Sequence, residues 1–409
     1  MNNQFVQLFF YLAGLYIIDG VVISYTRRLK ISDFVGHILT GVIFGILLKH
    51  SSTLLNREIF TSLSQNNFIF YLAQLGILVF FMQLGFNFSP KMFTTGNKKK
   101  LLLYTSLLVL ISTLVLGIVG YGYLFHKEGR STFYFVIAFL GINIGALLSR
   151  NFPVPTGFKR TFTTIVQMAL LVDLLVIFIF SFVQWYHTYL PMNPHDWLIE
   201  TLSWLLLTGF FALLFFPKAL DISSRFLYQW LGEFAMLLKL GVFFLFIYAG
   251  LKVGLSIMLI GLWSGFLFRY LAASTQFEAQ QKFFPIASYL YLIPFVEIGR
   301  FLVYQWDASP FFWQQLIFTL LGVAGIAIFY SMVMSAFKEK AMIFGLGVLP
   351  RGELSVLILW LLLTPTITGT MVLPTSMIVV GILAVMITSL IGTVLGIVLF
   401  TESADSTVI

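Results

Sequence analysis

The chain has 409 residues, of which 59% are hydrophobic and only 10% are charged, and its formal net charge is +8. Soluble globular chains carry about 25% charged residues, so this much apolar surface predicts a polytopic membrane protein. The absence of cysteine excludes disulfide scaffolds, thiol catalysis and cysteine-ligated metal sites, and five scattered histidines argue against an imidazole metal site.

Long apolar runs divide the chain into predicted membrane-spanning helices. A spanning helix needs about 20 mostly apolar residues. The runs of this kind predict an all-α polytopic membrane protein with about 13 transmembrane helices. Their predicted ranges are 5–26, 33–49, 68–88, 101–125, 133–149, 161–186, 197–217, 230–250, 254–271, 283–304, 312–336, 340–363 and 374–400.

The placement of lysine and arginine predicts the orientation of these helices. One alternating set of loops holds most of the 24 basic residues, and basic residues concentrate in cytoplasmic loops. We therefore expect an external N-terminus and a cytoplasmic C-terminus in the inner (cytoplasmic) membrane of a bacterial-type cell. The basic excess then reflects topology and indicates no nucleic-acid partner. The residues of this basic set are Arg27, Arg28, Lys30, Lys91, Lys98, Lys99, Lys100, Arg150, Lys159, Arg160, Lys218, Arg225, Arg269, Lys282, Lys338 and Lys340.

Several ionisable residues lie inside predicted helices, where a charge is costly. Asp19 lies in the middle of the first helix. His37 lies near the start of the second, where it can sense pH, although a lone histidine more commonly has a structural role. Glu297 and Arg300 in the tenth helix are three residues apart, and this spacing predicts a self-neutralising ion pair.

The fifth predicted helix carries Gly141 and Gly145 on either side of Asn143. This combination is suited to a broken helix with an oxygen ligand at the break. Glycines at this spacing are as often a plain helix-packing face. The residues themselves leave both interpretations open.

Asp173 is the strongest candidate for a functional ionisable group. It lies in the middle of the apolar sixth helix, with no basic residue within two turns on that helix. A carboxylate in this position can exchange a proton for a hard cation, which prefers oxygen ligands. The alternative is a structural carboxylate that is hydrogen-bonded to a neighbouring helix.

Residues 344–355 contain three glycines and Pro350, which predict an interruption of the twelfth helix. Free backbone groups at membrane depth are tolerated only where protein buries them or where they line a cavity. Arg351 is placed to neutralise such carbonyls or a carboxylate of a facing helix, with Glu353 two residues later. The alternative is an ordinary cytoplasmic helix start.

The two interrupted segments lie at equivalent positions of two predicted halves, each of six helices. We expect repeat one at about 5–186, a linker helix at about 197–217 and repeat two at about 230–400, followed by a short cytoplasmic tail at 401–409. Interrupted helices at corresponding positions indicate a transporter site built by inverted repeats with crossed discontinuous helices. Asp173 follows the first interruption by one helix.

Four segments resemble the monovalent cation:proton antiporters of the Kef-type branch, within the sodium/proton exchanger superfamily. Residues 34–45 resemble the glycine pattern of the family's second helix, 75–86 its third-helix signature, and 254–265 its ninth helix. Residues 350–353 resemble its arginine–glycine–glutamate element. The resemblance implies a two-repeat fold, a homodimer and alternating access.

The chain departs from this family at specific positions. The family's essential aspartate usually follows Asp, Asn or Gln, where this chain has Val172, and its threonine–serine pair aligns with Asn143 and Ile144. The range 312–337 contains no lysine. We also expect no cofactor and no nucleotide-binding regulatory domain in this chain.

These residues predict a secondary transporter that exchanges protons for Na⁺ or K⁺ in the lipid bilayer. Asp173 and Asn143 would bind the cation and proton, Arg351 and Glu353 would balance charge at the helix crossing, and Glu297 and Arg300 are secondary candidates. Two alternatives remain: a cation-coupled symporter of an organic anion, and a non-transporting sensor or assembly partner. No nucleophile–base pair, metal cluster or phosphate-binding loop suggests an enzyme.

Overall fold

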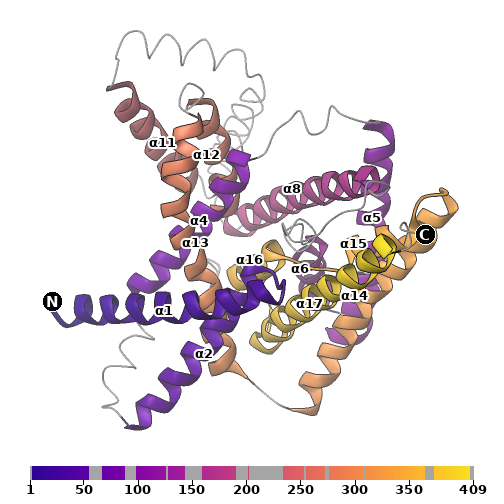
Figure 1. Ribbon diagram of the computed structural model, residues 1–409, viewed down its shortest axis with the longest axis horizontal. Coiled ribbons are helices and arrows are strands. Elements are labelled where there is room, and N and C mark those ends of the chain that lie inside the picture. The colour runs from indigo at the N-terminus through magenta and orange to yellow at the C-terminus, as the bar shows by residue number, and fades with distance from the viewer. Residues whose placement is uncertain are drawn as a thin grey trace. The chain divides into compact units, whose positions relative to one another are not determined.

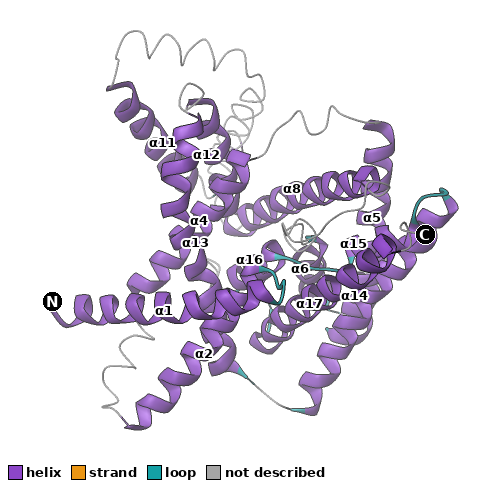
Figure 2. Ribbon diagram, in the orientation of Figure 1, coloured by secondary structure: helices purple, strands orange, loops and turns teal. Residues whose placement is uncertain are grey.

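The described part of the chain consists of helices joined by loops and turns (Figure 2). In the computed structural model, this part covers residues 2–54, 67–87, 98–125, 128–142, 159–189, 201, 234–252, 255–271, 276–306, 309–363 and 373–405.

Helices cover most of the described part of each predicted range (Figure 1). The main exceptions are residues 141–142, 255–256 and 349–352. The predicted linker helix at 197–217 lies outside the described residues, apart from residue 201. The helices are α1 (Asn2–Arg28), α2 (Asp33–Leu54), α4 (Asn67–Asn87), α5 (Lys98–Val119), η2 (Gly120–Leu124), α6 (Gly129–Leu140), α8 (Lys159–Tyr189), α11 (Phe234–Lys252), α12 (Ile257–Leu271), α13 (Gln276–Gln305), α14 (Pro310–Ala336), α15 (Ala341–Val348), α16 (Glu353–Leu361) and α17 (Thr375–Asp405).

Within the described residues, seven helical segments are long and apolar enough to cross a membrane by length and composition. They include α5, α8, α14, α17 and the α15–α16 pair. Exposed leucine, phenylalanine and tyrosine side chains are numerous along them, which is expected where lipid covers the surface. The chain is therefore a multi-pass membrane protein, and the total of 13 spans remains a prediction.

The helices group into two compact units. The first contains Met1–Gln65, Lys91–Val176 and Phe295–Ile409, and the second contains Asn66–Pro90 and Ile177–Pro294. In the first unit, α1 packs on α2, α14 packs on α5, α15 and α17, and α16 packs on α6 and α17. The second unit is built around α4 and α12.

Glycine allows close backbone approach between α4 and α12 in the second unit. A Cβ atom added to Gly85 would collide with the backbone carbonyl of Leu262, and one added to Gly265 would collide with that of Met82. Both glycines belong to segments that resemble the antiporter family. The structure thus provides a packing reason for them, since small residues let membrane helices approach closely.

Glycine also allows close backbone approach between α2 and α13 in the first unit. A Cβ atom on Gly41 would strike the carbonyl of Val296, and one on Gly299 would strike the carbonyl of Ile38. The glycine pattern of residues 34–45 is thereby explained in part by a helix crossing.

We expect Gly265→Ala to destabilise the protein by about 1–3 kcal/mol, because the added methyl group forces the α4–α12 pair apart. Gly241→Ala in α11 is the matched control, since nothing lies within 4 Å of its added Cβ atom. Alanine favours a helix over glycine by about 0.5–1 kcal/mol, so this control should be neutral or stabilising. Thermal unfolding midpoints in one detergent would measure both. Equal midpoints for the two variants would contradict the packing argument.

Candidate functional site

The predicted interruption near residue 350 is present in the structure. Helix α15 ends at Val348 and α16 begins at Glu353, so four residues separate the two helices (Figure 1). Pro350 cannot donate a backbone hydrogen bond, and Gly352 adopts an extended conformation at φ −124° and ψ −164°. The alternative of an ordinary helix start with Arg351 near the surface does not fit, because α15 precedes the break and Arg351 is fully buried.

Helix α6 ends earlier than the sequence predicts. The predicted range continued to residue 149, but α6 ends at Leu140, and Gly141 leaves the helix with φ −59° and ψ 142°. The extended Gly141 stops the helix, so its last carbonyl groups lose their intrahelical donors. Asn143 lies outside the described residues, and its predicted role as an ion ligand remains a prediction.

Arg351 provides donors for these carbonyl groups. Its side chain is fully buried, and Nη1 lies 3.3 Å from the carbonyl oxygens of both Leu140 and Gly141. The Ser355 hydroxyl donates to the same Gly141 oxygen at 3.4 Å. A positive charge at a helix C-terminus is electrostatically favourable. Through these contacts, the break before α16 packs against the end of α6.

Asp173 lies at the same junction. Asp173 is 8% exposed, and its Oδ1 accepts a hydrogen bond from the backbone N–H of Ile142 at 3.1 Å. A Cβ atom on Gly141 would lie 3.5 Å from this Oδ1 and 3.3 Å from the Ser355 hydroxyl. A side chain at 141 would thus lie in contact with both groups, so Gly141 is closely packed against the Asp173 carboxyl and the Ser355 hydroxyl. The sequence contained no direct signal for the Ile142 donor.

The charges at this junction do not pair completely. Arg351 and Glu353 are near enough to interact electrostatically with Asp173, but the described residues contain no ion pair between Asp173 and Arg351. Arg351 Nε and Nη2 are buried and have no hydrogen-bond partner among the described residues. With both carboxylates ionised, these three groups carry one net negative charge. One proton or one monovalent cation would neutralise it.

Glu297 and Arg300 form the predicted ion pair on α13. Arg300 Nε donates to Glu297 Oε2 at 3.0 Å, and the Tyr11 hydroxyl of α1 donates to Oε1 of the same carboxylate. Within the described residues, this cluster shares no hydrogen bond with Asp173 or Arg351. The secondary candidates are thus a separate group, and the Tyr11 contact had no signal in the sequence.

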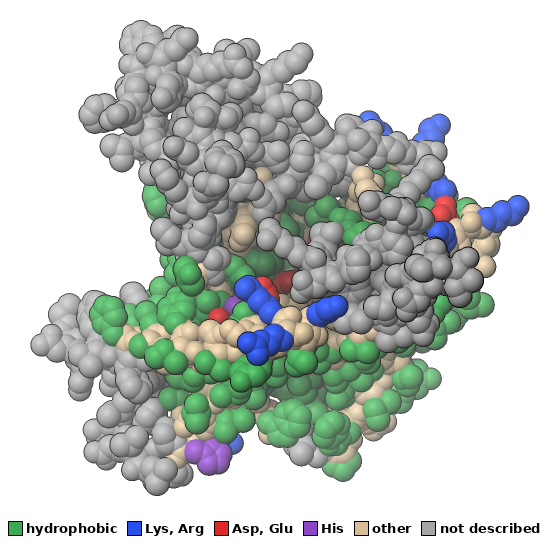
Figure 3. Space-filling model, in the orientation of Figure 1, with side chains coloured by type: hydrophobic (Ala, Val, Ile, Leu, Met, Phe, Trp, Pro, Cys, Tyr) green, Lys and Arg blue, Asp and Glu red, His purple; other side chains and the backbone are tan. Residues whose placement is uncertain are grey.

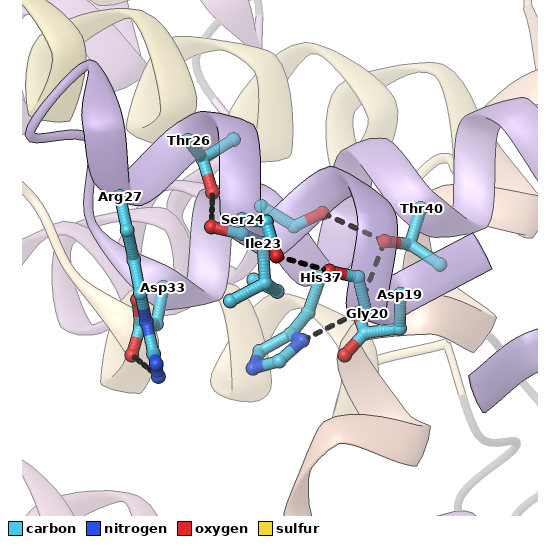
Figure 4. Close-up of polar contacts among 10 residues, drawn as sticks. Asp19, Gly20, Ile23, Ser24, Thr26, Arg27, Asp33, His37 and Thr40 are labelled. Atoms are coloured by element: carbon cyan, nitrogen blue, oxygen red, sulfur yellow. Dashed lines mark hydrogen bonds and ion pairs between the residues drawn. The ribbon is translucent and has the colours of Figure 1, made fainter. Parts of the chain in front are cut away.

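Asp19 and His37, which lie on two different helices, also pair (Figure 4). His37 Nδ1 lies 2.7 Å from Asp19 Oδ1, and Thr40 Oγ1 donates to the same oxygen at 3.0 Å. All three residues are buried. His37 and Thr40 are three residues apart and so share one face of α2, a spacing that points to a common partner.

We expect His37→Leu to destabilise the protein by about 1–3 kcal/mol, because it leaves the buried Asp19 carboxyl with one hydrogen-bond partner fewer. The double variant Asp19→Leu/His37→Leu should be more stable than His37→Leu, since removing both partners leaves no unsatisfied carboxyl. Thermal unfolding of the single and double variants would measure this. A double variant with the summed loss of both single variants would contradict the pairing.

These observations define a multi-pass helical membrane protein with a buried carboxylate where the end of α6 meets the break between α15 and α16. No protein-family profile matches the sequence, and no curated protein matches it either. Among solved structures, the chain is similar to the sodium proton antiporter MjNhaP1 from Methanocaldococcus jannaschii. The TM-score is 0.63 at 16% sequence identity, and the match covers 96% of each chain.

The chain thus has the fold of a sodium/proton antiporter, which confirms the all-helical, antiporter-like part of the predicted fold class. The protein in that structure is a transporter, and the expectation that this chain is not an enzyme remains a prediction. The Kef-type branch and the inverted repeats remain predictions.

Proposed function

We propose that the protein exchanges protons for a monovalent cation, Na⁺ or K⁺, and that Asp173 binds both. The observation that carries this proposal is the buried Asp173 carboxylate at the end of α6 and beside the break before α16. An ionisable group at membrane depth is costly and is a functional candidate for that reason. The fold that the chain shares with an antiporter supports the same conclusion.

The proposed cycle follows from charge. A cation binds to ionised Asp173 from one side of the membrane, alternating access exposes the site to the other side, and a proton replaces the cation. Asn143 and backbone carbonyls complete the cation shell, since a carbonyl that accepts from Arg351 keeps a second lone pair. Because one unit charge is neutralised either way, exchange is one for one and electroneutral.

The finer expectations belong to the same proposal. They are membership of the Kef-type branch, a homodimer, an external N-terminus, a cytoplasmic C-terminus and residence in the inner membrane.

The experiment is a proton-flux assay on the purified full chain in liposomes with a set internal pH. Addition of Na⁺ or K⁺ should dissipate the pH gradient, and choline at equal ionic strength should not. The rate should stay constant when a membrane potential is imposed, because exchange is electroneutral.

Two outcomes would reject the proposal. Uptake of an organic anion that depends on a cation would establish the symporter instead. A folded protein that responds to no ion and no solute would establish the non-transporting relative.

A further inference from the structure

A groove runs along the outside of the first unit, between α5 and α8. Its volume is about 540 Å³, and its walls are largely apolar. The α5 wall includes Leu102, Val109 and Leu114, and the α8 wall includes Leu171 and Leu175. Exposed fractions of 59% for Leu102 and 39% for Leu175 show that the groove opens to the surface. In a membrane, this surface faces the lipid.

The length of the groove fits one lipid chain. From Leu102 to Leu114, α5 rises about 18 Å at 1.5 Å per residue, close to the ~15 Å depth of one leaflet's hydrocarbon. The length of the groove thus matches the hydrocarbon depth of one leaflet.

Lys98 and Lys99 lie at the end of the groove that is nearest the start of α5. The α5 residues that line the groove recur every three or four positions, and the same helical face includes Lys98 and Lys99 one turn earlier. Both lysines are exposed. Lys100 lies on another face, where it pairs with Glu339 and lies 5.4 Å from the centre of the Tyr104 ring.

Basic side chains gather over this end of α5 and over the turn that follows α14 (Figure 3). Lys338 and Lys340 of that turn are exposed, like Lys98 and Lys99, and Glu339 lies between them. The groove-lining residues include no carboxylate. The open end of the apolar groove is thus electropositive.

We propose that this groove binds an anionic glycerophospholipid. One acyl chain lies between α5 and α8, and the phosphate lies at Lys98 and Lys99, whose apolar stems can follow the chain to the headgroup level. A lipid with a neutral headgroup could also place an acyl chain in the groove, but its headgroup would offer no net negative charge to Lys98 and Lys99. Leu171 and Leu175 flank Asp173 on α8, so the lipid packs against the helix that carries the buried carboxylate.

The test is native mass spectrometry of the purified full chain in a neutral detergent. It measures the dissociation constant of the first bound phosphatidylglycerol and of phosphatidylcholine with the same acyl chains. We expect the wild type to bind phosphatidylglycerol more tightly. Lys98→Gln/Lys99→Gln should weaken phosphatidylglycerol binding about 25-fold, since each lysine near an anionic lipid contributes about a factor of five. Phosphatidylcholine binding should not change.

Two further variants test the groove and the specificity of the charges. Ser106→Trp places a large side chain in the groove and should abolish binding of both lipids, whereas Ile328→Trp, at an exposed position of α14 that does not line the groove, should not. Arg28→Gln/Lys30→Gln removes the same charge elsewhere and should leave both constants unchanged. Unfolding midpoints without lipid verify that each variant is folded.

Equal affinities of the wild type for the two lipids would overturn the proposal. So would an equal loss of phosphatidylglycerol binding in Arg28→Gln/Lys30→Gln. Both readouts measure binding, so they do not depend on transport or on the function proposed for Asp173.

Discussion

The Asp173→Asn variant is expected to lose cation-dependent proton flux to the level of empty liposomes. An amide neither releases a proton nor supplies the negative charge that attracts a monovalent cation, so both half-reactions are lost together. The amide oxygen can still accept the hydrogen bond that Ile142 donates at 3.1 Å. Removing a buried ionisable group also lowers the desolvation cost, so the variant should stay folded. Proton flux and the thermal unfolding midpoint would be measured on the same preparation.

Glu128→Gln is the matched control for this substitution. It makes the same change from acid to amide at an exposed residue before α6, where the side chain makes no capping hydrogen bond. It should keep wild-type flux. If Asp173→Asn instead retains wild-type flux, the exchanging carboxylate must be another group, and Glu353 or Glu297 becomes the candidate.

The second large effect is expected for Arg351→Met. Methionine keeps much of the side-chain length but donates no hydrogen bond, so the carbonyl oxygens of Leu140 and Gly141 lose a charged donor. It also leaves Asp173 and Glu353 without the positive charge near them. Breaking a buried charge arrangement costs about 3–5 kcal/mol, so we expect a marked fall in the unfolding midpoint and loss of flux.

Arg351→Lys separates the charge of Arg351 from its geometry. Lysine keeps the positive charge but lacks the planar fork that reaches two carbonyl oxygens at once. We expect stability and flux between those of Arg351→Met and the wild type. If Arg351→Met unfolds at the wild-type midpoint and exchanges ions normally, the role assigned to Arg351 at the junction is wrong.

The site could be predicted in part because the membrane penalises certain residues. Asp173 and Arg351 were identified because ionisable groups in apolar segments are costly, and the break after α15 because Pro350 and Gly352 interrupt a helix. The end of α6 at Leu140 agrees with one of the two interpretations of Gly141 and Gly145, the broken helix. Gly141 and Gly145 both allow a break, and only the neighbouring helices decide between such positions.

The hydrogen-bond donors to Asp173 from Ile142 and to Glu297 from Tyr11 followed no pattern along the chain. Ile142 donates to Asp173 across 31 residues, and Tyr11 donates to Glu297 across 286. Such contacts depend on which helices pack together. A buried donor or acceptor requires a partner, but local sequence does not say where that partner comes from.

For this protein, the sequence by itself determined where the described helices form, the break near Pro350 and the ionisable residues that lie within apolar segments. In the hydrocarbon of a membrane, backbone N–H and C=O groups must be hydrogen-bonded within the protein. A long apolar helix makes these hydrogen bonds locally. Only the tertiary structure decided that the end of α6, the break before α16 and Asp173 share one junction. It also decided that Asp19 lies against His37, because these arrangements depend on packing between segments far apart in the chain.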